Sequence, residues 1–288
     1  MTAGQGVHTG AMHPFRVVVV GTLLVALGTG QDNVAALVRD LGSPTAASRS
    51  SACVALAALG PKAAPAIPAL SQALADELPE VRRAAGRALG KVGKAAIPRI
   101  KAALGDTSRA SGAALAVGEL GAEGASLVPE MLAIFQRGEG GSELSDNVTA
   151  ACVAIGAPAL PHLQKGMKRR GISGRCAEIL RSMGEAAAPA APALLELALD
   201  NTELPGARIP AFEALHAIGK AARAQAPKLL AFVCDGKQGV DMRGQAASAL
   251  ARIGHDDPAA ASKALQPFAN DPDEGFRKRV RAAIDALK

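Results

Sequence analysis

Histidine is the side chain best suited to acid–base or metal chemistry near neutral pH, and this chain has five. They are His8, His13, His162, His216 and His255. Their spacing matches no metal-ligand motif. His216 follows Glu213 by three residues in a helical pattern, so the two side chains share one face and resemble an acid–base pair. Neither a nucleophile nor a third orienting group accompanies them, which favours a solvated helix surface. The sequence therefore predicts no catalytic residue, no cofactor and no metal site.

The four cysteines are the other side chains with chemical potential. They are Cys53, Cys152, Cys176 and Cys234, and they form no C-x-x-C pair. An even number of cysteines permits disulfides if the protein is exported. Cys53 and Cys152, however, each lie in an apolar Ala-Cys-Val-Ala context, which favours buried thiols that pack as small hydrophobic residues.

Composition limits the elements that can carry these residues. Of the 288 residues, 49 % are hydrophobic, yet there are six Phe and no Trp or Tyr. The core must therefore consist of Ala, Leu, Val and Ile, which suits closely packed helices. The net charge of +6 is a mild excess that a large surface can carry without a nucleic-acid role.

Proline and glycine recur along the chain and divide it into units. A proline followed two residues later by an apolar residue recurs at spacings of 30 to 35 residues, at Pro68, Pro98, Pro129, Pro161, Pro192 and Pro227. An apolar run ends at a glycine at Gly60, Gly93, Gly121, Gly156, Gly184, Gly219 and Gly254. Proline fits the first turn of a helix, and glycine fits just past a helix end in a left-handed turn. Each unit thus predicts one helix opening and one helix ending.

Residues 67–93 show the repeating unit best. A first helix runs from Ile67 to Leu74, and a second helix carries Val81, Ala85, Ala88, Leu89 and Val92 on one apolar stripe. Neither helix can bury its stripe alone, so neighbouring pairs must stack. The fold class predicted is all-α, an α-α superhelix of about seven to eight helix pairs over residues 31–288.

Two segments carry a resemblance to a known family: Asp76–Gly93 (DELPEVRRAAGRALGKVG) and Asp271–Leu287 (DPDEGFRKRVRAAIDAL). They resemble the HEAT-like repeats first associated with phycobilin lyases. The resemblance implies a HEAT-repeat solenoid that acts mostly as a scaffold for binding. It also implies a structural ladder between adjacent repeats, in which a turn Asp pairs with an Arg six residues later. Asp76/Arg82 and Asp271/Arg277 keep this spacing. Arg49, Arg208 and Arg243 occupy the same place, but Ser43, Thr202 and Lys237 stand where the Asp is expected, so we expect the ladder to be interrupted there.

Three departures from the repeat mark where the superhelix is expected to bend. Residues 137–143 and 235–239 are polar, Gly-rich insertions. Pro210 lies early in a second helix, which we expect to start late or to kink.

Residues 1–30 lie outside the repeats. Arg16 precedes an apolar run, Val17–Leu27, and small residues follow, which is the three-part pattern of a secretory signal peptide. The run is too short to span a bilayer comfortably, so no transmembrane span is expected. If Met12 is the true start, the basic region has a normal length. The alternative is an apolar helix that caps the first repeat. The signal predicts export to the periplasm or the extracellular space; otherwise the protein is cytoplasmic.

The surface presented to partners is estimated by placing the second helices in register on their closing glycines. The candidate partner-binding residues are Arg83, Arg87, Lys91, Glu178, Arg181, Phe212, Glu213, His216, Lys278 and Arg281. Small residues between them predict a shallow trough for a partner's helix or extended segment. The ends of this concave face are basic but the middle is mixed, and aromatic platforms for bases are missing, which argues against a nucleic-acid groove.

The function that the sequence favours is a non-enzymatic scaffold for an unidentified protein partner, bacterial and exported, with no small-molecule substrate. One alternative is a nucleic-acid or other polyanion binder that acts through the basic end repeats. The other is an accessory subunit of a chromophore lyase.

Overall fold

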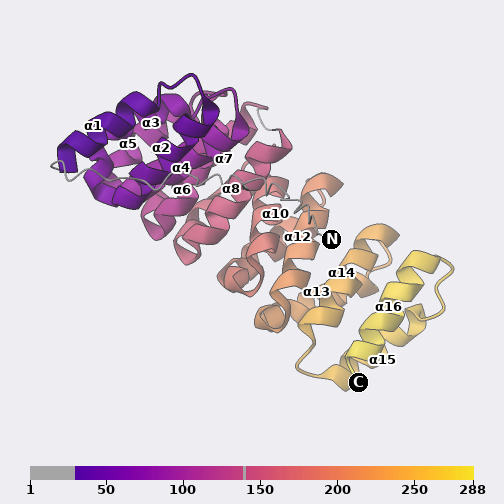
Figure 1. Cartoon of the computed structure of the whole chain (residues 1–288). Coiled ribbons are helices and arrows are strands. Elements are labelled where there is room, and N and C mark those ends of the chain that lie inside the picture. The colour runs from indigo at the N-terminus through magenta and orange to yellow at the C-terminus, as the bar shows by residue number, and fades with distance from the viewer. Residues whose placement is uncertain (1–29, 139–140) are drawn as a thin grey trace, which may run out of the picture.

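The structure is a computed structural model that describes residues 30–138 and 141–288. These residues form sixteen α-helices joined by short 3-10 turns, and no strand occurs among them. The helices alternate as first and second members of eight antiparallel pairs. The predicted all-α superhelix of seven to eight helix pairs is therefore confirmed (Figure 1).

The helix bounds show the repeat directly. The first helices are α1 (Gly30–Asp40), α3 (Ile67–Ala73), α5 (Ile97–Leu104), α7 (Val128–Gln136), α9 (Leu160–Met167), α11 (Ala191–Leu199), α13 (Ala226–Cys234) and α15 (Pro258–Leu265). The second helices are α2 (Ala46–Leu59), α4 (Pro79–Val92), α6 (Ala110–Leu120), α8 (Ser142–Ile155), α10 (Ser173–Met183), α12 (Pro205–Ile218), α14 (Val240–Ile253) and α16 (Glu274–Ala286).

Proline and glycine mark the helix boundaries as predicted. The six repeating prolines lie in the first turns of α3, α5, α7, α9, α11 and α13. All seven closing glycines have positive φ. Their conformation differs from the expected left-handed turn, because Gly60 has φ 56° and ψ −132° and Gly254 has φ 77° and ψ −170°. This region is essentially restricted to glycine, since a Cβ would clash there.

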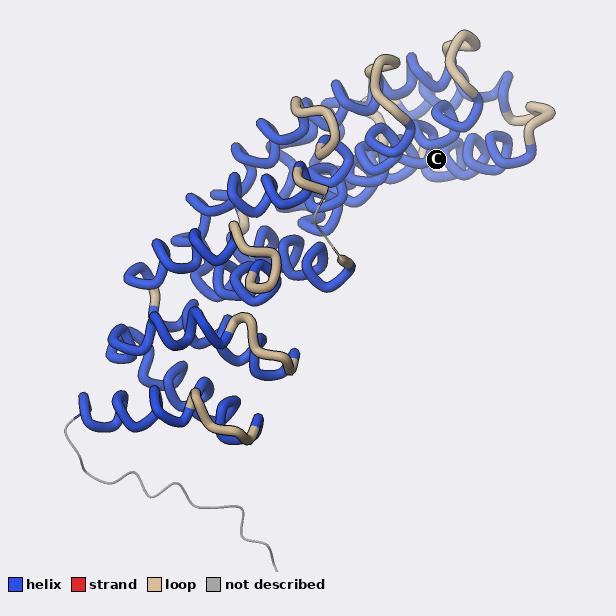
Figure 2. The backbone as a smooth tube through the Cα atoms, turned by 90° about the horizontal axis from the view of Figure 1, so that it is seen from above, coloured by secondary structure: helices blue, strands red, loops and turns tan. Residues whose placement is uncertain are grey.

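The pairs stack side by side, so each second helix packs against the second helix of the next pair. Figure 1 follows this stack from α1 to α16, and Figure 2 shows that it curves along its length. Helices α8 and α10 pack less extensively against each other than any other two successive second helices. This looser junction joins the fourth and fifth pairs, and the Gly-rich residues 137–143 lie within the fourth pair, from the end of α7 to the start of α8. Of these residues, 139 and 140 fall outside the described ranges.

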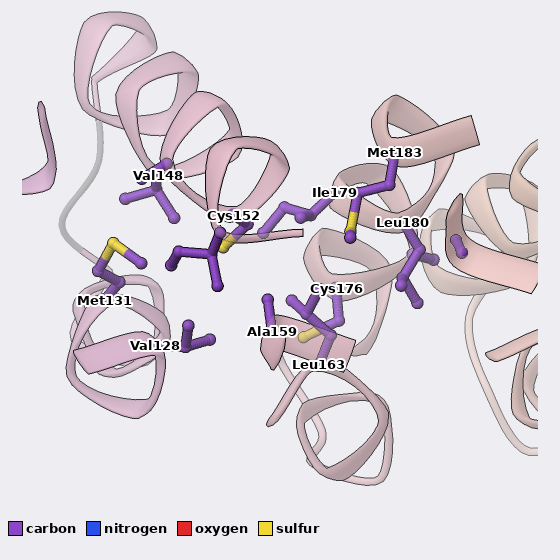
Figure 3. Close-up of a cluster of buried hydrophobic side chains, with 14 of the residues drawn as sticks. Val128, Met131, Val148, Cys152, Ala159, Leu163, Cys176, Ile179, Leu180 and Met183 are labelled. Atoms are coloured by element: carbon purple, nitrogen blue, oxygen red, sulfur yellow. The ribbon is translucent and has the colours of Figure 1, made fainter. Parts of the chain in front are cut away.

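The core is a continuous layer of small aliphatic side chains between the first and second helices. Figure 3 shows one part of it, where α7, α8, α9 and α10 converge. Its labelled members are Val128, Met131, Val148, Cys152, Ala159, Leu163, Cys176, Ile179, Leu180 and Met183. The thiols of Cys53 and Cys152 are fully buried, as predicted. Burial raises the pKa of both to about 12, so neither forms the reactive thiolate at neutral pH.

Glycines on the second helices serve close packing between neighbouring helices. A Cβ at Gly86 would lie 2.4 Å from the carbonyl oxygen of Gly112, and one at Gly90 would lie 2.3 Å from the Cβ of Glu119. The predicted shallow trough is therefore wrong at α4, because α6 fills the space that these small residues leave. Interior helical glycines cost about 1 kcal/mol each relative to Ala, and close approach of the two helices offsets that cost.

Arg82 and Arg277, which were expected to pair with the Asp carboxylate six residues back, bind backbone carbonyl oxygens instead. Arg82 donates to the carbonyl oxygen of Asp76 (2.9 Å), and Arg277 donates to that of Asp271 (2.7 Å). The expected pairing with the Asp carboxylate is therefore wrong for both. The acceptor six residues back is a carbonyl oxygen, which every residue type supplies, so Ser43 serves Arg49 in the same way (3.1 Å).

In the sixth and seventh pairs, the corresponding arginines stack on phenylalanine rings. Arg208 donates to the carbonyl oxygen of Ala198 and lies over Phe232. Arg243 donates to Val233 and lies 4.8 Å and 4.4 Å from the ring centroids of Phe268 and Phe276. Both arginines are buried. Planar guanidinium groups suit this stacking. The contacts of Arg243 with Phe268 and Phe276 therefore hold the eighth helix pair against the seventh.

Two further expectations concern Pro210 and the N-terminal residues. Helix α12 begins at Pro205, five residues before Pro210, so the late start expected at Pro210 is wrong. The apolar run Val17–Leu27 and the proposed Met12 start lie outside the described residues.

Within the described ranges, one run, Ala46–Ala73, is long and apolar enough to cross a membrane by length and composition. It comprises α2, a 3-10 turn (Gly60–Ala66) and α3, with Gly60 at positive φ between the two helices. Its residues Cys53, Leu56 and Leu70 belong to the core, and core helices readily reach this apolar content.

Candidate functional site

The candidate partner-binding residues all lie on second helices. Helix α4 carries Arg83, Arg87 and Lys91; α10 carries Glu178 and Arg181; α12 carries Phe212, Glu213 and His216; α16 carries Lys278 and Arg281. Figure 1 shows α4 and α16 near opposite ends of the stack, so these residues do not form one site. Those of α10 and α12 lie on adjacent helices, and four of them line a common pocket.

This pocket has a volume of about 310 Å³ and lies across α10, α12 and α14. It is lined by Arg181, Phe212, Glu213, His216, Ala217, Gln245 and Ser248. Three successive repeats thus each contribute one second helix. Most of its lining surface is apolar, with polar groups at the edges, as in sites that hold an apolar side chain of a partner.

Phe212 forms the buried part of this lining. The register on the closing glycines placed it among exposed positions, but it is only 1 % exposed, so that expectation is wrong. Its ring lies 5.9 Å from the ring of Phe232 on α13, centroid to centroid, between the two helix layers. The pocket therefore has an aromatic floor rather than a projecting aromatic side chain.

His216 connects α12 to α14. Its Nδ1 lies 3.0 Å from the carbonyl oxygen of Ser248. A carbonyl oxygen can only accept, so Nδ1 carries the proton and, in the neutral ring, Nε2 remains an acceptor. The imidazole is thereby oriented by the neighbouring repeat at the rim of the pocket.

Glu213 faces α10 rather than the histidine. Its carboxylate oxygen lies 3.7 Å from Nε of Arg181, and both side chains are about half-exposed. The two residues that resembled an acid–base pair thus have separate partners on opposite neighbouring helices. This geometry positions no group for proton transfer between them. Among the described residues, no group of three or more His, Cys, Asp or Glu side chains is placed to hold a metal ion.

The candidate residues predicted from sequence included none on α14, so Gln245 and Ser248 were missed. The structural arginines provide the missing signal for Ser248. Glu213 follows Arg208 by five residues, and Ser248 follows Arg243 by five residues. The closing glycines give the same register, because Arg208 and Arg243 lie eleven residues before Gly219 and Gly254. Either alignment makes Ser248 the counterpart of Glu213, whereas Gln245 corresponds to Pro210 and is found by neither.

Some of the cations in the end repeats are already bound by neighbouring groups. On α4, Lys91 pairs with Glu119 (2.9 Å) and Arg83 lies 3.9 Å from Glu143. On α16, Lys278 pairs with Glu274, and Arg281 donates to Ala269 and Asn270. Cations already bound by protein groups contribute less to the attraction of a phosphate backbone.

Comparison with known proteins places these repeats in a family. Residues 34–121 match the family described as HEAT repeats. No curated protein matches the chain.

Three solved structures illustrate the similarity of the fold. Human deoxyhypusine hydroxylase is 22 % identical, with 90 % of this chain and 96 % of that chain covered and a TM-score of 0.35. The CpcE–CpcF complex of phycocyanin lyase from Nostoc sp. PCC7120 is 21 % identical, with 97 % and 100 % covered and a TM-score of 0.36. Yeast importin-beta (Kap95p) is 15 % identical, with 88 % and 42 % covered and a TM-score of 0.44. At these TM-scores the likenesses carry no argument about function.

The three helix pairs matched in residues 34–121 continue with the same proline and glycine boundaries through the sixth and seventh pairs. Residues 34–121 therefore match HEAT repeats, and the described residues as a whole form a helical solenoid of such helix pairs.

Proposed function

We propose that this protein is a non-enzymatic scaffold that binds a segment of a protein partner on its second-helix face. The observation that carries the proposal is the pocket across α10, α12 and α14, with Phe212 as its floor. Interfaces gain most of their affinity where an apolar or aromatic anchor enters a well-packed pocket. The rim of Glu213, His216 and Gln245 offers hydrogen-bonding groups for the partner's backbone, as helix-groove and extended-segment recognition require.

Site-specific photo-crosslinking in the producing cells tests this proposal. We would place p-benzoylphenylalanine at Gln245, inside the pocket, and at Ala102, an exposed residue of α5, as the matched control. A partner in the pocket gives a discrete crosslinked protein from position 245 and none from position 102. Ala217→Arg, which adds a long side chain to the exposed pocket wall, should remove the crosslink, whereas Ala102→Arg should preserve it.

Circular dichroism melting of both arginine variants separates blocked binding from loss of the fold. Both alanines are exposed, so both variants should melt like the parent protein. A crosslink that persists unchanged in a folded Ala217→Arg variant would contradict the proposal.

We also propose that the protein is exported from a bacterial cell. Arg16, the apolar run Val17–Leu27 and the small residues that follow support a cleaved secretory signal. Intact mass and N-terminal sequencing of protein from its native source test this: cleavage after about residue 28 to 30 in an extracytoplasmic fraction is expected. A cytoplasmic protein that retains Val17–Leu27 would refute export without affecting the binding proposal.

A further inference from the structure

A second pocket adjoins the first at the C-terminal end of α12. Its volume is about 360 Å³, and it is lined by Glu185, Ala217, Ile218, Gly219, Lys220, Ala221 and Arg252. Ala217 lines both pockets, so the two adjoin at that residue. We call the combined surface the α12 groove.

The second pocket lies about one helical turn beyond the first. Arg181 and Glu185, His216 and Lys220, and Ser248 and Arg252 are each four residues apart. In each couple the first residue lines the apolar pocket and the second lines the polar pocket. Ser248 and Arg252 lie on α14, where positions four apart are about 6 Å apart on one face, whereas Glu185 and Lys220 lie just past the ends of α10 and α12. The α12 groove therefore runs along α14 toward the C-terminal ends of α10 and α12.

The two ends of the α12 groove differ in charge compensation. In the apolar pocket, Arg181 is paired with Glu213. In the polar pocket, neither Lys220 nor Arg252 has a hydrogen bond or ion pair with any residue that the structure describes, and both are exposed. Neighbouring Arg223, by comparison, is 4.0 Å from Asp256.

The side chains that line the polar pocket carry a net positive charge. Glu185 contributes one carboxylate against the two cations. The C-terminal ends of α10, α12 and α14 each add partial negative charge, part of which is already bound by the N–H groups of Gly184, Gly219 and Gly254. An anion at this end therefore gains two unpaired cations, one of which is a guanidinium that can bind a carboxylate in bidentate geometry.

We infer that the α12 groove selects a partner segment in which an apolar side chain precedes or follows a carboxylate at about 6 Å. The apolar side chain packs on Phe212 and Ala217, and the carboxylate pairs with Lys220 and Arg252. Residues i and i+4 of a helix, or i and i+2 of an extended chain, provide this separation. The inference rests on the proposed function and specifies the chemistry of the partner.

Selection from a random peptide library displayed on phage tests the inference with the full chain. The parent protein should enrich peptides that combine an apolar residue and an Asp or Glu at one recurrent spacing. The charge-reversed variant Lys220→Glu/Arg252→Glu should enrich the same apolar residue with Lys or Arg at that spacing. A control variant, Lys228→Glu/Lys263→Glu, changes the net charge equally at exposed positions of α13 and α15, and it should select the parent's acidic pattern.

One enriched peptide, labelled with fluorescein, then gives affinities by fluorescence anisotropy. Arg252→Ala should weaken binding about tenfold and Lys220→Glu/Arg252→Glu at least a hundredfold, whereas the control variant should change it less than threefold. Replacement of the peptide's acidic residue by Asn or Gln should remove the difference between parent and Arg252→Ala.

The outcomes separate this inference from the proposed function. If the parent protein selects apolar peptides without any preference for an acidic residue, and Ala217→Arg does not bind them, the inference is overturned but the proposed binding surface is supported. Peptides that bind Ala217→Arg as well as the parent would overturn both. An acidic pattern that the Lys228→Glu/Lys263→Glu control also reverses would overturn the inference, because net charge alone would then explain it.

Discussion

Arg49 and Asp76 form a bidentate ion pair that joins the first helix pair to the second. Nε of Arg49 lies 2.7 Å from Oδ2 of Asp76, and Nη2 lies 2.9 Å from Oδ1. The side chains are only 12 % and 9 % exposed. Nη1 of the same guanidinium donates to the carbonyl oxygens of Ser43 and Pro44. One arginine therefore closes its own turn and also holds the turn of the next repeat.

Asp76→Asn is predicted to destabilise the protein by about 1 to 3 kcal/mol at neutral pH, because it leaves the nearly buried guanidinium of Arg49 with only the exposed Glu77 carboxylate, 3.6 Å away, as an anion. The hydrogen bond from Arg49 holds the pKa of Asp76 below its ordinary value. A lowered pKa in the folded state means that the stabilisation is complete above the unfolded pKa of about 4 and is lost as pH falls further. Urea denaturation at about pH 7 and pH 3 should show a smaller loss of stability on acidification in the variant.

The control for Asp76→Asn is Lys278→Gln, which removes an exposed ion pair with Glu274. Exposed pairs contribute about 0.5 kcal/mol, so this variant should unfold almost like the parent. Equal effects of the two substitutions would show that the Arg49–Asp76 pair has no special role between the repeats.

Local signals made the fold predictable, and non-local packing made the site less so. Pro68 and Gly93 mark a helix start and a helix end through their own backbone chemistry, so their positions in the sequence suffice. Phe212 is different, because its burial depends on Phe232, twenty residues away on another helix. A register based on one helix could not detect that contact.

The partners of the ladder arginines were also difficult to predict from sequence. The turn position of Arg49 was recognisable from sequence, but its carboxylate partner belongs to the following repeat, 27 residues later. Reading six residues back led to Ser43, which supplies a carbonyl oxygen rather than a side chain. Backbone acceptors are invisible to residue-type patterns, so the sequence predicted an interruption where the structure has its inter-repeat ion pair.

Gly90→Ala is predicted to destabilise the protein by about 1 to 3 kcal/mol despite the better helix propensity of Ala. The added Cβ would lie 2.3 Å from the Cβ of Glu119 and 2.7 Å from the carbonyl oxygen of Ala116. Both contacts involve atoms on or next to the backbone of α6, so the two helices must separate. Thermal unfolding monitored by circular dichroism measures the effect.

Gly206→Ala provides the opposite control. Gly206 lies in the first turn of α12, and a Cβ there would meet no atom within 4 Å. The substitution should stabilise the protein by about 0.5 kcal/mol, since it restricts the unfolded chain without a clash. A stabilising effect of Gly90→Ala of similar size would mean that α4 and α6 are not in close contact.

Arg243→Lys is predicted to loosen the last helix pair while it preserves the charge. The lysine ammonium cannot stack as a plane between Phe268 and Phe276, and it lacks the Nε–H that donates to Val233. Hydrogen–deuterium exchange should accelerate at least tenfold in α15 and α16 and stay unchanged in α4. Exchange that rises uniformly along the chain would instead indicate that the solenoid unfolds as one unit.

Alkylation by iodoacetamide at about pH 8 is predicted to modify Cys234 well before the other three cysteines. Cys53, Cys152 and Cys176 are fully buried, and burial raises the pKa of each to about 12, so roughly one thiol in 10,000 is ionised at that pH. Burial also raises the pKa of Cys234, but its side chain is partly exposed, so the reagent can reach it. Peptide mass spectrometry should find Cys234 labelled first in the native protein and all four cysteines labelled similarly in urea. Native labelling of Cys152 as fast as Cys234 would show that the core at α8 opens readily, which would contradict the full burial of Cys152 in the side-chain cluster of Figure 3.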